Sequence, residues 1–179
     1  MTIHGSSRAF AIWITGLPAS GKSTIVRALT PQLEAQGLRV EVLESDEVRR
    51  VLTPEATYSQ AERDLFYRAL ALMGAKLVAQ GVTVIFDATA TRREHRDFAR
   101  RLIPRFIEVA VECPLEICTQ RDYKGTYQRG QRGESNTVPG LQSPYEPPVS
   151  PDLTIDTTKV QASAAAENVL ALVKKRFLQ

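Results

Sequence analysis

A glycine-rich motif close to the start of the sequence is its strongest chemical signal. Residues 16–24 read GLPASGKST and match the pattern G-x-x-x-x-G-K-[ST] in full. The apolar run FAIWIT leads into the motif, and an amphipathic helical pattern follows it. Backbone N–H groups of such a loop, together with the positive end of the following helix, bind phosphate oxygens. The motif therefore predicts that the protein binds a nucleoside triphosphate.

The residues of this loop have separate expected roles. Glycine at positions 16 and 21 allows a close approach of the backbone to phosphate. We expect Lys22 to reach the β- and γ-phosphates and the Ser23 hydroxyl to bind Mg²⁺. ATP and Mg²⁺ are thus the expected cofactors. The predicted nucleotide-binding residues are Gly16, Ala19, Ser20, Gly21, Lys22, Ser23 and Thr24.

Two aspartates follow apolar runs that read as strands. Asp46 comes after VEVLES, and Asp87 comes after VTVIF. A parallel sheet binds its ligands at the carboxyl edge, where both side chains would lie near the phosphate loop. One carboxylate could orient or deprotonate an acceptor hydroxyl while the other binds Mg²⁺ or its waters. The alternative for each aspartate is a simple helix cap.

The elements that must position these residues alternate along the chain. Short β-rich runs are separated by helical patterns, which is typical of βαβ units and a parallel sheet. Helices are predicted after the phosphate loop, over about 59–80 and over about 160–177. The middle helix should begin with a Ser59–Glu62 capping box. Its expected apolar stripe consists of Leu65, Phe66, Ala69, Leu70, Leu72, Met73, Leu77 and Val78. The expected strands cover residues 10–15, 39–44, 82–86, 106–112 and 153–156.

Residues 124–151 show hardly any apolar pattern and are rich in Gly, Pro, Arg and Ser. A segment of this length in a compact domain is usually functional or disordered. Its arginines and two tyrosines favour a lid over the active site. The expected architecture is one domain over residues 1–179, an α/β three-layer P-loop kinase fold with a parallel five-stranded sheet and this basic lid.

Composition places the chain among ordinary globular proteins. Of its 179 residues 43% are hydrophobic and 24% are charged, with a formal charge of +3. Basic residues gather at 92–105 and 124–132, a pattern that fits a small anionic ligand as well as a polymer. No apolar run reaches the length of a membrane span, and no secretory signal is recognisable. Cys113 and Cys118 read as reduced core thiols. We therefore expect a cytoplasmic protein that has no membrane partner.

Three further features favour a kinase among P-loop proteins. The chain is barely longer than the minimal fold, which leaves no room for the extra domains of motor ATPases. It lacks the Asn-Lys-x-Asp motif with which GTPases read guanine. The two strand-end aspartates also suit phosphoryl transfer to a hydroxyl.

The chain resembles the adenylylsulfate (APS) kinases, small P-loop enzymes that move the ATP γ-phosphate to the 3′-hydroxyl of APS in sulfate assimilation. The resemblance runs from about Phe10 to Thr157. It rests on GLPASGKST, LESDEVR, FIEVAVECPLEICTQRDYKGTY and PGLQSPYEPPVSPDLTIDT. It implies that the partner is a small nucleotide acceptor, that nucleic acid is not one, and that a homodimer is possible.

The resemblance also implies roles for individual residues. Asp46 would be the base at the acceptor hydroxyl. Arg49 and Arg63 would hold the anionic groups of the substrate. Arg121 would contact ATP phosphates or the transferring group, where a cation stabilises the developing charge. Lys124 would bind substrate at the start of the lid. The alternative for each arginine is a solvated helix face.

Departures from the family pattern cluster around the expected acceptor site. Ser45 and Glu47 replace a glycine and an asparagine, and Phe66 replaces an asparagine. Val138 stands where the family has an aromatic wall, whereas Tyr58 retains the aromatic residue at the opposite wall. The loss of stacking would weaken APS binding, so we expect the acceptor to be APS or a closely related nucleotide.

Two alternative functions remain at this stage. The stretch DATATRREHR, residues 87–96, resembles a second group of small P-loop kinases that includes polynucleotide 5′-kinases and metabolite kinases. The acceptor would then be a nucleic-acid end or a small metabolite. The other alternative is a nucleotide-binding module without catalytic activity, which would bind ATP and transfer nothing.

Overall fold

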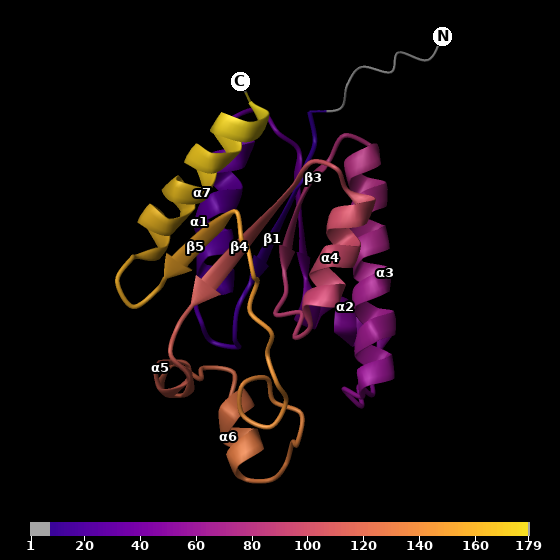
Figure 1. Ribbon diagram of the computed structural model, residues 1–179, viewed down its shortest axis with the longest axis vertical. Coiled ribbons are helices and arrows are strands. Elements are labelled where there is room, and N and C mark those ends of the chain that lie inside the picture. The colour runs from indigo at the N-terminus through magenta and orange to yellow at the C-terminus, as the bar shows by residue number, and fades with distance from the viewer. Residues whose placement is uncertain (1–7, 179) are drawn as a thin grey trace.

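The computed structural model describes residues 8–178, and within them a five-stranded sheet forms the centre of the molecule (Figure 1). All neighbouring strands are parallel, in the order β2-β3-β1-β4-β5. Each expected strand is present to within one residue at either end. The strands are β1 (Ala11–Thr15), β2 (Val40–Glu44), β3 (Thr83–Asp87), β4 (Phe106–Glu112) and β5 (Leu153–Asp156).

Helices cover both faces of the sheet and complete the three layers (Figure 1). α1 and α7 pack together on one face, and α3 and α4 pack together on the other. The helices that correspond to α1, α3 and α7 were predicted from the sequence, whereas α2, α4, α5 and α6 were not. The helices are α1 (Lys22–Glu34), α2 (Ser45–Leu52), α3 (Gln60–Ala79), α4 (Arg93–Leu102), α5 (Leu115–Gln120), α6 (Thr126–Gln131) and α7 (Ala162–Phe177).

The alternation of side chains along β1 divides the core into two halves. Ile12 and Ile14 join the cluster under α1 and α7, whereas Ala11 and Trp13 join the cluster under α3 and α4. Trp13 stacks on Phe86 of β3 with ring centroids 4.5 Å apart. Because every residue of β1 is buried, this strand is the rigid base from which the phosphate loop leaves the sheet.

The buried face of α3 differs from the predicted stripe. Leu65, Leu72 and Met73 are exposed, so the prediction that they are buried is wrong. The helix instead turns a mixed face inward, which consists of Arg63, Phe66, Tyr67, Leu70, Ala71 and Gly74. Phe66 and Leu70 confirm that part of the predicted stripe, whereas Arg63 was missed because an arginine is ordinarily expected in solvent.

The predicted capping box at the start of α3 is only half present. The Ser59 hydroxyl accepts the backbone N–H of Glu62, at 3.3 Å, as expected. The Glu62 carboxylate does not return to Ser59. It accepts the backbone N–H groups of Thr57 at 2.6 Å and Tyr58 at 3.3 Å. The loop before α3 is thereby held close to the helix.

The segment 124–151 is more ordered than its composition predicted. It contains α6, whose Tyr127 is fully buried and donates from its hydroxyl to the Pro18 carbonyl at 3.0 Å. Val138 packs with Tyr127 and Cys118 in a small separate cluster. This part of the segment therefore rests on the phosphate loop in the described structure.

Residues 1–7, on which part of the expectation about a signal sequence rests, lie outside the described residues. Within residues 8–178, no helix has the length and apolar character that crossing a membrane requires.

Candidate active site

The phosphate-binding loop connects β1 to α1 through strained and closely packed backbone. A Cβ atom on Gly16 would lie 2.5 Å from the carbonyl oxygen of Val111, so only glycine fits there. Gly21 is the N-cap of α1 and has φ of 101°, and Ala19 also has a positive φ of 57°. Ser20 is completely buried. This conformation presents the loop and the N-terminus of α1 to a ligand, as the motif predicts.

Lys22 lies at the centre of this loop. Its Nζ donates to the carbonyl oxygens of Gly16 at 3.1 Å and Leu17 at 2.8 Å. Burial lowers the pKa of Lys22, while the charges of Asp87 and Asp46 oppose that shift. A buried cation that is held only by carbonyl oxygens is well suited to receive phosphate oxygens.

Two cavities meet at the phosphate loop. The helix-side cavity, of about 700 Å³, is lined by residues 21–25, by 157–162, and by Arg121. The lid-side cavity, of about 800 Å³, is lined by α2, the loop 53–58, and residues of 122–139. Their linings share Ala19, Lys22, Ser23 and Tyr123. Lys22 and Ser23 therefore stand where ligands of the two cavities would approach each other.

Both strand-end aspartates line the lid-side cavity. Asp87 ends β3 and is 5% exposed. Burial raises its pKa, and the charge of Lys22 and a hydrogen bond from Ser23 oppose that rise. The next helix, α4, has Arg92 at its N-cap, so the helix-cap alternative is wrong for Asp87.

Asp46 differs from Asp87 in its surroundings. It lies in the first turn of α2, whose N-cap is Glu44, and its side chain is 62% exposed. Lys124 bridges the two carboxylates, with its Nζ 2.8 Å from Asp46 and 3.2 Å from Glu44. The expected lid residue and the expected base are thus in direct contact.

The residues around Ser23 suit Mg²⁺. The Ser23 hydroxyl is close enough to Asp87 to oppose the rise in the pKa of that carboxyl, so two oxygen ligands for a metal lie near each other beside the phosphate loop. Across the described part of the chain, no group of three or more His, Cys, Asp or Glu side chains could hold a metal ion alone. Mg²⁺ is usually bound by one or two protein oxygens, substrate phosphates and water. The donor set therefore fits a magnesium ion that arrives with a nucleotide.

Arg49 is buried in the wall of the lid-side cavity, not on a solvated helix face. Its Nη1 lies 3.1 Å from the Glu62 carboxylate, and its guanidinium lies over the Phe66 ring at 3.8 Å and the Tyr58 ring at 5.0 Å. Its Nη2 is buried and has no hydrogen-bond partner among the described residues. An unpaired donor in a cavity wall is suited to an anionic ligand.

Arg63 is also buried and serves as a connector. It donates to the Tyr58 carbonyl at 2.9 Å and to the Thr137 carbonyl of the lid segment at 2.7 Å. Tyr58 itself has an uncommon positive φ of 54°. Val138, the next lid residue, is 3% exposed. Arg63 thus fixes the two walls of the cavity relative to each other.

Arg121 lies at the opposite side, in the helix-side cavity. It donates to the Thr157 hydroxyl and the Thr157 carbonyl, both at 3.1 Å, and the Thr157 hydroxyl donates to Ser20 O at 2.8 Å. Thr157 was not predicted as a site residue, and Glu62 was predicted only as part of a helix cap and not as the partner of Arg49. Thr157 directly follows β5, so the strand-end rule that identified the aspartates would have found it.

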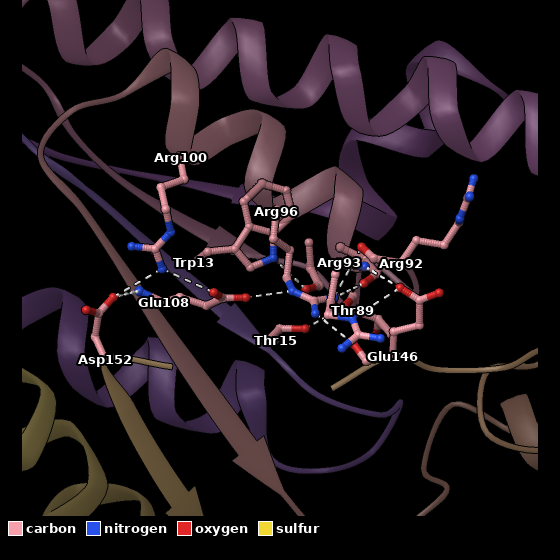
Figure 2. Close-up of polar contacts among 12 residues, drawn as sticks. Trp13, Thr15, Thr89, Arg92, Arg93, Arg96, Arg100, Glu108, Glu146 and Asp152 are labelled. Atoms are coloured by element: carbon pink, nitrogen blue, oxygen red, sulfur yellow. Dashed lines mark hydrogen bonds and ion pairs between the residues drawn. The ribbon is translucent and has the colours of Figure 1, made fainter. Parts of the chain in front are cut away.

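Two arginines of the basic stretch at 92–105, Arg96 and Arg100, are bound to other parts of the protein. Arg96 is completely buried and donates to the Glu108 carboxylate and to the Glu146 carbonyl, each at 2.7 Å (Figure 2). Arg100 pairs with Glu108 at 3.1 Å and with Asp152 at 3.3 Å. These arginines bind protein groups, so the expectation that the cluster serves an anionic ligand or polymer is wrong for them.

Comparisons with known proteins agree with this site. The family model for adenylylsulphate kinase matches residues 8–156. A probable adenylyl-sulfate kinase of Archaeoglobus fulgidus is 40% identical over 151 residues, which cover 84% of this chain and 97% of the relative. The adenylyl-sulfate kinase of Synechococcus sp. strain JA-3-3Ab is 38% identical over 173 residues, covering 96% and 98%.

A solved structure extends the likeness to three dimensions. The APS kinase of Mycobacterium tuberculosis, in complex with AMPPNP and APS, superimposes with a TM-score of 0.87. Its sequence identity to this chain is 32%, and the match covers 93% of this chain and 98% of that one. With its phosphate loop, its two cavities and these relatives, the chain belongs to the adenylylsulphate kinase family.

Proposed function

We propose that this protein transfers the γ-phosphate of ATP to the 3′-hydroxyl of APS, giving 3′-phosphoadenylylsulfate and ADP. The observation that carries the proposal is the meeting of the two cavities at Lys22 and Ser23. A nucleotide in the helix-side cavity and an acceptor in the lid-side cavity would have their reacting groups at this junction. Family membership supplies the identities of the donor and the acceptor.

The proposed chemistry depends mainly on positioning and on charge. Asp46 accepts the proton of the acceptor hydroxyl as its oxygen attacks the γ-phosphorus. Lys22 and Arg121 stabilise the charge on the phosphoryl oxygens as the bond to ADP breaks. Lys124 is close enough to Asp46, at 2.8 Å, to move between that carboxylate and an anionic substrate.

Mg²⁺ would be held by Ser23 and Asp87 and would neutralise charge on the β- and γ-phosphates. Asp87 meets this requirement because it is buried and lines the lid-side cavity together with Lys22 and Ser23. We assign Asp87 to the metal because it lies near Lys22 and Ser23 of the phosphate loop. We assign Asp46 to the acceptor because it lies on α2, in the wall of the lid-side cavity.

The proposed acceptor site takes its anion-binding groups from Arg49 and Arg63. The unpaired Nη2 of Arg49 supports a contact with an anionic group of APS. Phe66 does not leave a gap where the family has asparagine, because its ring lies under the Arg49 guanidinium. Val138 contributes an apolar surface in place of an aromatic one.

The alternative acceptors lose their main support. A polynucleotide 5′-kinase was suggested by residues 87–96, but Arg96 of that stretch is completely buried and Arg92 pairs with Asp64 at 3.5 Å. Phosphate contacts by nucleic-acid-binding proteins need accessible cations. A catalytically inactive module stays a distinct alternative, and turnover decides against it.

The test is an ADP-coupled assay with APS and a panel of nucleotides and RNA 5′-hydroxyl ends, with direct chromatographic detection of 3′-phosphoadenylylsulfate. We expect turnover with APS, and much slower turnover with adenosine nucleotides that lack the sulfate group. Turnover with another acceptor and none with APS would contradict the proposed substrate. ATP binding without transfer to any acceptor would instead support the inactive module.

Two further expectations from the sequence stay predictions. A homodimer is possible, and sedimentation at micromolar concentrations distinguishes it from a monomer. We also expect a cytoplasmic location, which the two free cysteines, Cys113 and Cys118, support because reducing compartments keep thiols reduced. Cell fractionation tests this second expectation.

A further inference from the structure

The segment expected to be a lid consists of two differently anchored parts. Residues 124–143 contain α6 and line the lid-side cavity. Residues 144–152, here called the strap, run back to β5 and line neither cavity. Because the strap lines neither cavity, contact with substrate does not explain its role. Its polar contacts with the rest of the protein indicate a structural role instead.

The strap is attached to α4 near its start and to β4 at its end. Near its start, the backbone N–H of Glu146 donates to Thr91 O at 2.8 Å, and Arg96 donates to the Glu146 carbonyl at 2.7 Å. At its end, the Asp152 carboxylate accepts the backbone N–H of Glu108 at 2.7 Å. Figure 2 shows this line of contacts from Asp152 through Glu108 and Arg96 to Glu146.

Directly before the first of these anchors, Tyr145 reaches the active-site edge of the sheet. Its hydroxyl oxygen lies 3.0 Å from the Thr15 hydroxyl oxygen, and the Thr15 hydroxyl donates to Thr89 O at 2.6 Å. Since a threonine hydroxyl has a single hydrogen, Tyr145 must be the donor to Thr15. Burial raises the pKa of Tyr145, so its hydroxyl keeps that hydrogen at neutral pH.

This chain of hydrogen bonds connects two pieces of the catalytic apparatus. Thr15 is the last residue of β1 and precedes Gly16 of the phosphate loop. Thr89 follows Asp87 by two residues. Thr15 is completely buried, so water cannot replace the bond from Tyr145 without a structural change. The β1–β3 ladder already pairs Ile14 with Asp87, and the bond between Thr15 and Thr89 extends this connection beyond Asp87, at the point where the phosphate loop leaves β1.

We propose that Tyr145 is a positioning residue for phosphoryl transfer, which acts by donating to Thr15 and so fixes the Asp87 carboxylate relative to the phosphate loop. Arg96 supports it by holding the strap through the Glu146 carbonyl, and its guanidinium also lies 5.9 Å from the centre of the Tyr145 ring. The proposal rests on the proposed function only for the identity of the acceptor.

The first test compares Tyr145→Phe with the wild type in APS phosphorylation. Small displacements of reacting groups cost large factors in rate, so we expect kcat to fall about tenfold. The KM values for ATP and APS should stay within about twofold, because the binding surfaces of both cavities are unchanged. An unchanged kcat, with or without a lower melting temperature, would overturn the proposal.

Variants at Thr15 distinguish positioning from simple packing. Thr15→Val removes the hydroxyl and should lower kcat at least as much as Tyr145→Phe, whereas Thr15→Ser keeps the hydroxyl and should restore most of it. The double variant Tyr145→Phe/Thr15→Val should be no slower than Thr15→Val alone, since both lie in one chain of bonds. If each variant lowered kcat by the same factor, and the factors multiplied in the double variant, Tyr145 and Thr15 would not act through one chain of hydrogen bonds.

The matched control is Thr30→Val. The Thr30 hydroxyl donates to the Val26 carbonyl within α1 at 2.9 Å, away from both cavities. Its loss removes the same type of hydrogen bond, so kcat should be unchanged even if the melting temperature falls.

A second readout needs no acceptor and therefore separates this proposal from the proposed function. Calorimetry with a non-hydrolysable ATP analogue measures how much Mg²⁺ strengthens nucleotide binding. Misplacement of Asp87 should reduce that enhancement several-fold in Tyr145→Phe and Thr15→Val, and leave the affinity without Mg²⁺ unchanged. If the wild type fails to phosphorylate APS, the proposed function is wrong. If the Mg²⁺ enhancement is the same in all variants, the positioning role is wrong.

Discussion

The helix-side cavity and the lid-side cavity lie side by side at the phosphate loop but are assembled in different ways. The first is lined mainly by two continuous stretches, residues 21–25 and 157–162. The second takes its lining from α2, the loop before α3, the end of β3 and the segment 122–139. Its ligand-binding side chains are held by other side chains, as Arg49 is held by Glu62 and Phe66.

This difference predicts different responses to mutation. In the helix-side cavity, backbone N–H groups supply much of the binding, so single substitutions should affect catalysis more than nucleotide affinity. In the lid-side cavity, buried side chains supply the binding, so substitutions should change substrate affinity directly. Lys22→Ala and Arg49→Met test this contrast directly, and variants of Asp46 and Asp87 separate catalysis and stability from binding.

The largest effect is expected for Lys22→Ala. Removal of the cation at the junction of the cavities should lower kcat about a thousandfold, because Lys22 stabilises charge on the transferring group. The affinity for an ATP analogue should fall much less, since the loop backbone still binds the phosphates. Steady-state kinetics and calorimetry measure the two effects. Lys175→Ala, which changes an exposed lysine on α7, is the control.

Asp46→Asn is expected to have the next largest effect. Loss of the proposed base should lower kcat about a hundredfold or more with little change in either KM. The comparison variant is Asp97→Asn, which alters an exposed carboxylate on α4. Wild-type turnover by Asp46→Asn would remove Asp46 from the mechanism and leave Asp87 as the other strand-end aspartate in the lid-side cavity.

Arg49→Met should affect the acceptor alone. Loss of a charge-assisted contact should raise the KM for APS about tenfold to a hundredfold. The KM for ATP should be unchanged, because Arg49 lines only the lid-side cavity of the two. Arg68→Met, at an exposed position on α3, provides the control. An equal rise in both KM values would abolish the distinction between the cavities.

The smallest effect concerns stability. Burial raises the pKa of Asp87, and such a carboxyl stabilises the fold below its ordinary pKa and loses that contribution as pH rises through the raised value. Asp87→Asn should therefore melt a few degrees higher than the wild type at neutral pH, while losing activity. The difference should shrink towards about pH 4, where the wild-type carboxyl is protonated in both states. Thermal melts across pH measure it, and a lower melting temperature at neutral pH would contradict the interpretation.

Local patterns predicted the frame of the molecule well. The strands were found because each is short, apolar and flanked by polar residues, and the phosphate loop because its glycines and Lys22 are contiguous. The strand-end rule also brought Asp46 and Asp87 to one cavity without any knowledge of packing.

Periodicity failed where charged side chains are buried. The inward face of α3 contains Arg63, and the inward face of α4 contains His95 and Arg96. A rule that treats arginine as solvated assigns such faces to the outside. Whether a basic cluster binds a ligand or other protein groups depends on partners far away in sequence, such as Glu108 and Glu146 for Arg96.

The sheet, the phosphate loop and the class of reaction could be predicted from the sequence, because each depends on residues that are adjacent or at regular spacing. Three other features became visible only in the folded chain: which arginines face the lid-side cavity, the attachment of residues 144–152 to α4 and β4, and the contact of Tyr145 with Thr15 across 130 positions of the chain. These contacts arise when separate elements pack together, so no local pattern records them.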